Sequence, residues 1–143
     1  MKLTKFTHAC VRLEKEGRVL VLDPGSFSET EQALAGADAV LITHEHADHI
    51  DVDAVSGALL ANKELQLFAP DGVASQLRGK APDAAERIST VAADESFEAA
   101  GFAIRSFGGQ HALIHLQIPV VANVGYLVDG NVYHPGDSFA IPD

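Results

Sequence analysis

The sequence contains a single cysteine, Cys10, so the chain cannot form an intramolecular disulfide. Cys10 stands in a strand-like stretch, and we expect a small buried apolar side chain rather than a nucleophile. Basic residues are also scarce: 10 Lys and Arg stand against 20 Asp and Glu, and they form no cluster. Because nucleic acids and anionic membranes attract clustered positive charge, we expect neither as a partner.

Long hydrophobic runs are missing too. The N-terminus, Met1-Lys-Leu-Thr-Lys, lacks the apolar core of a signal peptide. The longest apolar stretch, residues 118–128, is interrupted by Asn123 and Gly125 and is too short to span a bilayer. Since there are no repeats or linkers, we expect one cytoplasmic domain over residues 1–143 with a sizeable core.

Hydrophobic patterning predicts a mixed α/β fold. The turn Lys15-Glu16-Gly17 joins two apolar stretches in a hairpin, and Asp129-Gly130 predicts another hairpin. Asp51 and Asp71 are expected to cap helices. Strands are expected at 11–13, 19–22, 37–43, 65–70, 88–91, 97–99, 102–107 and on both sides of Asp129-Gly130, and helices at 29–35, 51–62 and 72–78. Strands interleaved with helices, followed by antiparallel hairpins, indicate a layered architecture.

One stretch, "LITHEHADHID", crowds three histidines and three acidic residues behind a short apolar run. Imidazole nitrogens and carboxylate oxygens suit Zn²⁺ and similar divalent ions. If the preceding strand continues, His44 and His46 point the same way and can hold one ion. A bend would then let Asp48 and His49 face a second ion. The alternative is a solvated polar loop, but the position after a buried strand favours a site.

His44, His46, Asp48 and His49 resemble the signature of the metallo-β-lactamase superfamily of hydrolases. The resemblance continues along the chain. "THACVRLEKEGRVLVLDPG" is similar to the first hairpin of the family and the turn after it, "GGQHALIH" resembles the segment with a third histidine ligand, and "YHPGDS" resembles the segment with a bridging aspartate. The sequence of these segments is most similar to the branch that contains ascorbate-6-phosphate lactonase and related metal-dependent hydrolases.

The resemblance implies two divalent metal ions, with zinc expected and manganese or iron as alternatives. In that arrangement the first ion is held by His44, His46 and His111. Asp48 and His49 belong to the second ion, and Asp137 bridges the two. A metal-bound hydroxide would attack a lactone, ester or phosphoester of a small molecule, while Asp48 orients it or relays its proton.

Four further residues have candidate roles around this site. Asp23 is expected to brace the loops by hydrogen bonding rather than to bind metal. His115 lies four residues after His111 and is a candidate to contact substrate or protonate a leaving group. His8 follows the first strand and is a candidate to line the site. For His134 the alternative is a packing role. For His8 and His115 the alternative is an ordinary strand or loop histidine without a function in the site.

The family fold is a four-layer αββα sandwich, and full members are longer than this chain. We therefore expect an incomplete second half, without the further histidine that completes the second metal site. Uncovered apolar strands would favour association, so a homo-oligomer is expected. Besides a hydrolase, two interpretations stay open: a metal-binding but inactive or interaction domain derived from one, and, with little support from the scarce basic residues, a nucleic-acid processing enzyme.

Overall fold

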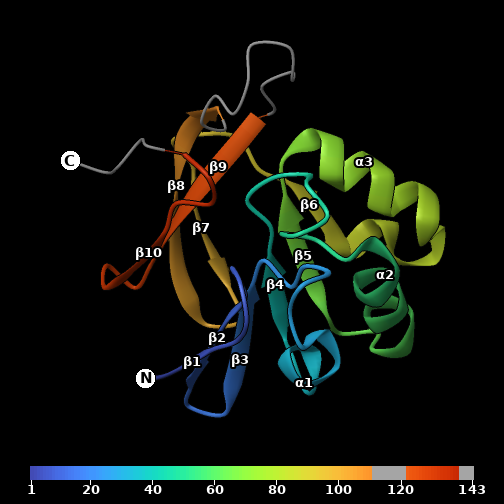
Figure 1. The fold of residues 1–143 in the computed structure, drawn as a ribbon, viewed down its shortest axis with the longest axis horizontal. Coiled ribbons are helices and arrows are strands. Elements are labelled where there is room, and N and C mark those ends of the chain that lie inside the picture. The colour runs from blue at the N-terminus through green and yellow to red at the C-terminus, as the bar shows by residue number, and fades with distance from the viewer. Residues whose placement is uncertain (111–121, 139–143) are drawn as a thin grey trace.

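Two β-sheets pack face to face, and helices cover the outer face of one of them (Figure 1). The computed structural model describes residues 1–110 and 122–138. The first sheet has the strand order β1 (Lys2–Lys5), β2 (Val11–Lys15), β3 (Arg18–Leu22), β4 (Ala39–Leu41), β5 (Gln66–Ala69) and β6 (Ile88–Thr90). The second sheet has the order β10 (Val132–His134), β9 (Ala122–Val128), β8 (Phe102–Gln110) and β7 (Ser96–Ala99). Strands β3 to β6 are parallel, whereas the second sheet is antiparallel throughout.

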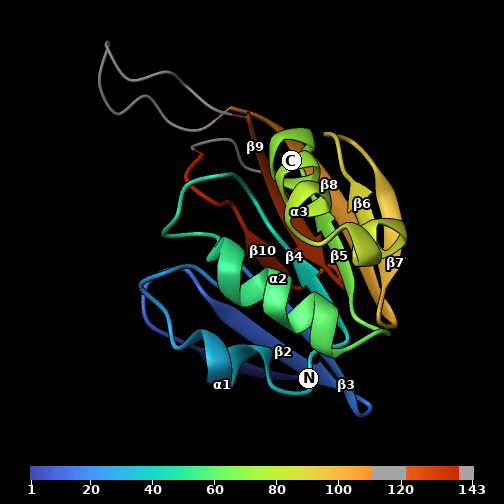
Figure 2. The same ribbon diagram turned by 90° about the vertical axis from the view of Figure 1, so that its right-hand side faces the viewer.

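The helices lie together on one side of the first sheet (Figure 2). They are α1 (Thr30–Leu34), α2 (Val52–Ala61) and α3 (Asp71–Lys80), and the 3₁₀ turn η1 (Pro82–Arg87) follows them. The predicted cap of α2 is confirmed, because the Asp51 side chain accepts a hydrogen bond from the Ala54 N–H at 3.0 Å. The predicted cap of α3 is wrong: Asp71 is the first helical residue, and Pro70 occupies the cap position.

Side-chain alternation sends successive residues of β3 and β4 to opposite faces of the first sheet, and both faces are covered there. Val21 and Val40 pack against the helices, whereas Leu20 and Leu41 pack against the second sheet, and all four are fully buried. Parallel strands read as continuous apolar runs because neither face meets water. Cys10 is fully buried in this core, which confirms the prediction of a small buried side chain, and its burial raises the pKa of the thiol to about 12.

The predicted α/β layering is confirmed in three layers: helices, first sheet and second sheet. Within residues 1–110 and 122–138, no helix lies on the outer face of the second sheet. That face carries the exposed side chains of Glu98 and Arg105 and the partly buried rings of Phe107 and Tyr133. In the described part of the chain, none of the helices combines the length and hydrophobicity that a membrane-spanning helix needs.

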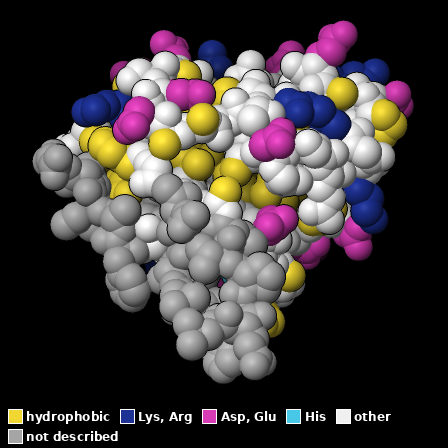
Figure 3. Space-filling model, turned by 90° about the horizontal axis from the view of Figure 1, so that it is seen from above, with side chains coloured by type: hydrophobic (Ala, Val, Ile, Leu, Met, Phe, Trp, Pro, Cys, Tyr) yellow, Lys and Arg dark blue, Asp and Glu magenta, His cyan; other side chains and the backbone are white. Residues whose placement is uncertain are grey.

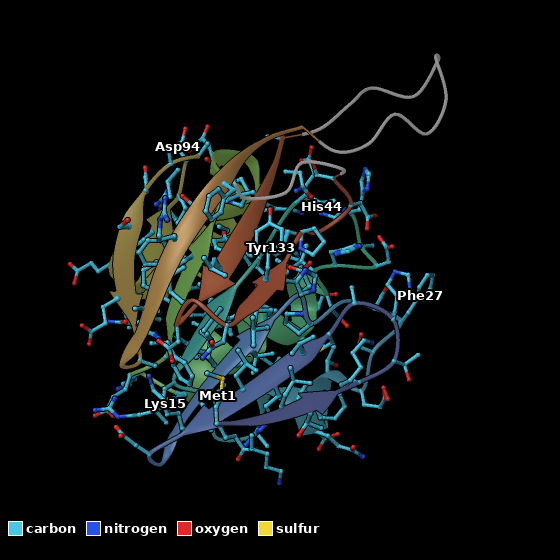
Figure 4. The ribbon with its side chains drawn as sticks, turned by 90° about the vertical axis from the view of Figure 1, so that its left-hand side faces the viewer. Met1, Lys15, Phe27, His44, Asp94 and Tyr133 are labelled. Carbon is cyan, nitrogen blue, oxygen red and sulfur yellow. The ribbon has the colours of Figure 1, made fainter. Side chains whose placement is uncertain are left out.

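Several chain segments reach one end of this sandwich and supply the candidate site. Strands β3 and β4 run parallel, so Asp23 and the loop after Leu41 leave the first sheet at the same edge. The predicted strand over residues 37–43 is too long: β4 ends at Leu41, and the histidine cluster begins in irregular structure. Figure 4 shows His44 at this end and Lys15 at the opposite end of the molecule.

At the opposite end, one ion pair joins the two sheets. Lys15 Nζ, on β2, lies 2.7 Å from Asp129 Oδ2 and 4.6 Å from the centre of the Phe102 ring. Asp129 Oδ1 accepts the Ala103 N–H at 2.8 Å. Burial alone would raise the pKa of Asp129, but the hydrogen bonds from Lys15 and Ala103 outweigh it and lower the pKa.

The substitution Asp129→Asn should lower the free energy of unfolding by about 1 kcal/mol at neutral pH, because it removes the charge opposite Lys15. Asparagine keeps the acceptor for Ala103 and tolerates the positive φ of 50° at this turn. Since the folded-state pKa of Asp129 is depressed, its contribution is present above the ordinary value of 3.8 and is lost as pH falls through the folded pKa. Urea unfolding should therefore show a difference that shrinks on acidification. Asp94→Asn, at an exposed position with φ 60°, is the matched control and should change little.

Candidate metal centre

The site is built on the buried carboxylate of Asp23, directly after β3. Its Oδ1 accepts the Thr43 N–H at 2.8 Å, and its Oδ2 accepts the Thr43 hydroxyl at 2.6 Å. The same Oδ2 lies 2.6 Å from Nδ1 of His49. Because a carboxylate cannot donate, Nδ1 of His49 carries the ring proton, and Nε2 offers a lone pair.

A second imidazole is oriented through Thr43. The single hydroxyl proton of Thr43 goes to Asp23, so its oxygen accepts from Nδ1 of His44 at 2.8 Å. Nε2 of His44 is then the basic nitrogen, as it is in His49. Histidines that bind a metal through one nitrogen are commonly fixed in this way by a hydrogen bond from the other.

The two basic nitrogens face carboxylates at distances that suit a shared cation. Nε2 of His49 lies 3.2 Å from Asp137 Oδ1 and 3.6 Å from Asp48 Oδ2, and Nε2 of His44 lies 3.6 Å from Asp137 Oδ2. Two ligands bound tetrahedrally to zinc at about 2.0–2.1 Å are about 3.3–3.4 Å apart. Nε2 of His49 is buried and has no hydrogen-bond partner among the described residues, which is the expected state of a nitrogen whose partner is a metal.

His46 joins the same group from the loop. Its ring centre lies 4.9 Å from that of His44, and one ligand atom each of His44, His46 and Asp48 lie within 4.8 Å of one another. The sequence-based expectation that His44 and His46 lie together therefore agrees with the geometry, although no strand places them there.

The electrostatics of the site favour a cation. Burial alone would lower the pKa of His49, but the hydrogen bond to Asp23 and the charges of Asp23, Asp137 and Asp48 outweigh it and raise the pKa. For Asp48, burial would raise the pKa, but the hydrogen bond with His8 and the charge of His49 outweigh it and lower the pKa. His44 and His49 are buried, whereas Asp48 and Asp137 are partly exposed, so the site opens toward solvent on its carboxylate side.

Backbone hydrogen bonds and a close approach at Gly25 hold two loops of the site together. The loop after Asp23 lies against the loop of the histidines: Ser26 N–H donates to Ala47 O at 2.8 Å, and Asp51 N–H donates to Pro24 O at 2.9 Å. Gly25 allows this approach, because a Cβ there would lie 2.0 Å from the Asp48 carbonyl oxygen.

The loop of Asp137 is held by Asn123 and His134. Asn123 Oδ1 accepts the Asp137 N–H at 3.1 Å, and its Nδ2 donates to Pro135 O at 2.8 Å. His134 Nδ1 accepts the Gly136 N–H at 3.1 Å, and Nε2 lies 2.7 Å from the Ala9 carbonyl, to which it donates. Both ring nitrogens of His134 therefore bind backbone, which favours the packing role over contact with substrate.

Most of the site residues predicted from the sequence lie together in the structure, and two of them lie outside the described residues. The structure brings together His8, Asp23, His44, His46, Asp48, His49 and Asp137, whereas His111 and His115 lie outside the described residues. Thr43 and Asn123 were missed. The place of Thr43 directly before His44 was a usable signal, but Asn123 looked only like an interruption of an apolar run.

Asp23→Asn should weaken metal binding by about 10- to 100-fold, as is typical for residues that orient ligands. The amide can donate to Nδ1 of His49, which would move the ring proton to Nε2 and remove the lone pair. Competition titration with a zinc-binding dye measures the affinity. The control is Asp38→Asn, which replaces a carboxylate that accepts the Val19 N–H far from the site and should leave the affinity unchanged. Unchanged binding by Asp23→Asn would contradict the orienting role.

Gly25→Ala should lower the free energy of unfolding by roughly 1–3 kcal/mol, because the new methyl group overlaps the backbone at Asp48. The same substitution at Gly57 is the matched control. Gly57 is exposed in α2, and a methyl group added there would meet nothing within 4 Å beyond its chain neighbours and the backbone of its own helix, so Gly57→Ala should raise stability by up to about 1 kcal/mol. Urea unfolding of both variants checks the opposite signs, and equal stabilities would rule out the close approach at Gly25.

Comparison with known proteins identifies relatives of this chain. The chain is 37% identical over 147 residues to Protein Rv0786c of Mycobacterium tuberculosis, covering 99% of the chain and 66% of that protein. It is 31% identical to a UPF0173 metal-dependent hydrolase of Xanthobacter autotrophicus, covering 78% of the chain and 49% of the relative. The chain thus spans about half to two thirds of the length of these relatives.

A solved structure shows the same fold. A Parabacteroides distasonis protein, provisionally named a metal-dependent hydrolase, superposes with a TM-score of 0.71 at 21% identity, over 95% of this chain and 60% of that one. A family model described as a beta-lactamase superfamily domain matches residues 2–143. With the layered α/β fold and the His and Asp cluster at the strand ends, the chain belongs to the metallo-β-lactamase superfamily.

Proposed function

We propose that the chain is a metal-dependent hydrolase domain that cleaves a lactone, ester or phosphoester of a small molecule. The observation that carries the proposal is the convergence of two buried imidazole nitrogens on Asp48 and Asp137 at 3.2–3.6 Å. A relative named a metal-dependent hydrolase at 31% identity supports it. The segments "GGQHALIH" and "YHPGDS" further support the ascorbate-6-phosphate lactonase-like branch.

In this proposal the chain holds two divalent ions, zinc in preference to manganese or iron. His44, His46 and His111 would hold one ion, Asp48 and His49 would hold the other, and Asp137 would serve both. When bound, the ions would supply Lewis acidity and lower the pKa of a coordinated water.

The protein groups have distinct tasks. Asp23 and Thr43 keep the protons of His49 and His44 on Nδ1, so that both Nε2 atoms keep their lone pairs. Asp48 has one oxygen bound to His8 and a second oxygen to orient the attacking water or accept its proton. His115 is the proposed proton donor to the leaving group.

Small-molecule substrates remain the proposed partners. On the face shown in Figure 3, the Lys and Arg side chains of the described residues lie apart from one another and close to acidic ones, which gives polyanions no continuous basic surface. Self-association of the chain also stays a prediction, based on the outer face of the second sheet.

The decisive test is hydrolysis by metal-loaded protein, with metal content measured on the same samples. A panel of a lactone, an aryl ester and a phosphodiester, assayed with Zn²⁺ and with Mn²⁺, should show activity that falls more than about 100-fold in His46→Ala and Asp48→Ala. Glu45→Ala is the matched control, because Glu45 stands between the candidate ligands but is exposed, and it should keep activity. Two bound ions without turnover on any substrate would instead favour a metal-binding or interaction domain.

A further inference from the structure

The residue next to the candidate second ion that has no assigned task is His8. It lies on the loop between β1 and β2, 40 residues from Asp48 in the sequence. Its Nε2 is 2.7 Å from Asp48 Oδ2. Ligand atoms of His8, Asp48 and His49 lie within 4.8 Å of one another, so His8 has two possible tasks: it binds the ion directly, or it binds Asp48.

The distance between His8 and Asp48 distinguishes these two roles. The Nε2 atoms of His44 and His49 lie 3.2–3.6 Å from the carboxylate oxygens that face them, which suits two ligands of one tetrahedral ion. The His8–Asp48 distance of 2.7 Å is shorter than that spacing and is typical of a hydrogen bond to a charged acceptor. His8 is therefore placed as a donor to Asp48.

The chain also fixes both residues that flank His8. Glu29 accepts the N–H and the hydroxyl of Thr7 at 2.9 and 3.0 Å, and Ser28 donates to the Thr7 carbonyl at 2.6 Å. On the other side, His134 donates to the Ala9 carbonyl. Long-range hydrogen bonds thus anchor the loop immediately before and after His8.

His8 itself adopts a conformation that histidine does not favour. Its φ is +65°, in the left-handed region, which persists in a non-glycine residue only when the surroundings enforce it. Lys5 Nζ donates to the His8 carbonyl. The ring meets Phe27 and His49 edge to face, with centres 5.4 and 5.6 Å away, which aims Nε2 at Asp48. Figure 4 shows Phe27 on the same side of the molecule as His44.

We propose that His8 is a positioning residue of the second metal ion: it donates its Nε2–H to Asp48 Oδ2, the oxygen that lies 3.6 Å from Nε2 of His49, and so holds this carboxylate in place for the ion. The inference rests on the metal centre of the proposed function. It assigns a task to the loop between β1 and β2, whose contacts with Glu29, Ser28 and His134 hold the donor in place.

The test compares His8→Ala and His8→Gln with the parent chain. Zinc affinities are measured for each bound equivalent by dye competition, and Co²⁺ absorption spectra report the ligand set. His8→Ala should bind the second equivalent about 10- to 100-fold more weakly and the first within about twofold of the parent. His8→Gln should recover most of the loss, because its amide N–H can donate from a similar reach while the amide is a poor replacement for a metal-binding imidazole.

A spectroscopic readout distinguishes donor from ligand directly. In the zinc-loaded parent, long-range ¹H–¹⁵N spectra should show a proton on Nε2 of His8, because a donor keeps it. Loss of that proton on zinc addition, or failure of His8→Gln to rescue, would make His8 a ligand and overturn the proposal. Unfolding of each variant in chelator establishes that the variants fold. If His8→Ala does not fold, the comparison of His8→Gln with the parent and the Nε2 proton decide the question.

The outcomes also separate this inference from the proposed function. Two ions in the parent with unchanged affinities in His8→Ala would overturn the positioning role and leave the hydrolase proposal intact. A parent chain that binds no zinc would remove the metal centre and, with it, the inference about His8.

Discussion

The arrangement of the site depends on one buried carboxylate. Asp23 is fully buried, yet its two oxygens accept from the backbone and hydroxyl of Thr43 and from His49, so its charge is compensated by hydrogen bonds. An uncompensated charge at this depth would be strongly destabilising. The hydrogen bonds that compensate the charge also determine which nitrogens of His44 and His49 are basic. The same hydrogen bonds therefore stabilise the buried charge and orient the two histidines for metal binding.

The surroundings keep other donors away from Asp23. Tyr126 is fully buried nearby, and burial together with the charge of Asp23 raises the pKa of its hydroxyl. That hydroxyl donates to the Ile42 carbonyl at 2.8 Å and not to the carboxylate. His134 Nε2, at 3.9 Å from Asp23 Oδ2, donates to Ala9. Both of these donors therefore bind backbone carbonyls, while the carboxylate accepts from Thr43 and His49.

Much of this could be predicted from the sequence, and the failures have identifiable causes. Short apolar runs predicted the strands that are buried on both faces, and Asp129-Gly130 predicted the β9–β10 hairpin. An apolar run does not show where a strand ends, so β4 was extended past Leu41 to Thr43, which is buried for a different reason: it binds Asp23. Asp71 looked like a cap by residue type, but Pro70 before it takes that place.

In the candidate site, too, the sequence predicted local groupings but not long-range contacts. Spacing alone grouped His44, His46, Asp48 and His49, because they are close in sequence. The contacts of Thr43 with Asp23, of Asn123 with Asp137 and of His8 with Asp48 span 14 to 40 residues along the chain, so strand order and loop contacts decide them. Those contacts follow from the way the sheets pack, which no local pattern contains.

The site also depends on the packing of the two sheets. His44 and His49 follow β4 of the first sheet, whereas Asp137 follows β10 of the second. The sheets meet beside the site where Val124 N–H donates to Thr43 O at 2.9 Å and where Tyr126 binds Ile42. An ion held by ligands from both sheets binds the packed state and not the separated one. By linkage, an ion at 100 times its dissociation constant would stabilise that packing by about 2.7 kcal/mol, a large share of the stability of a small domain. Metal binding at the proposed site would thus be coupled to the packing of the two sheets.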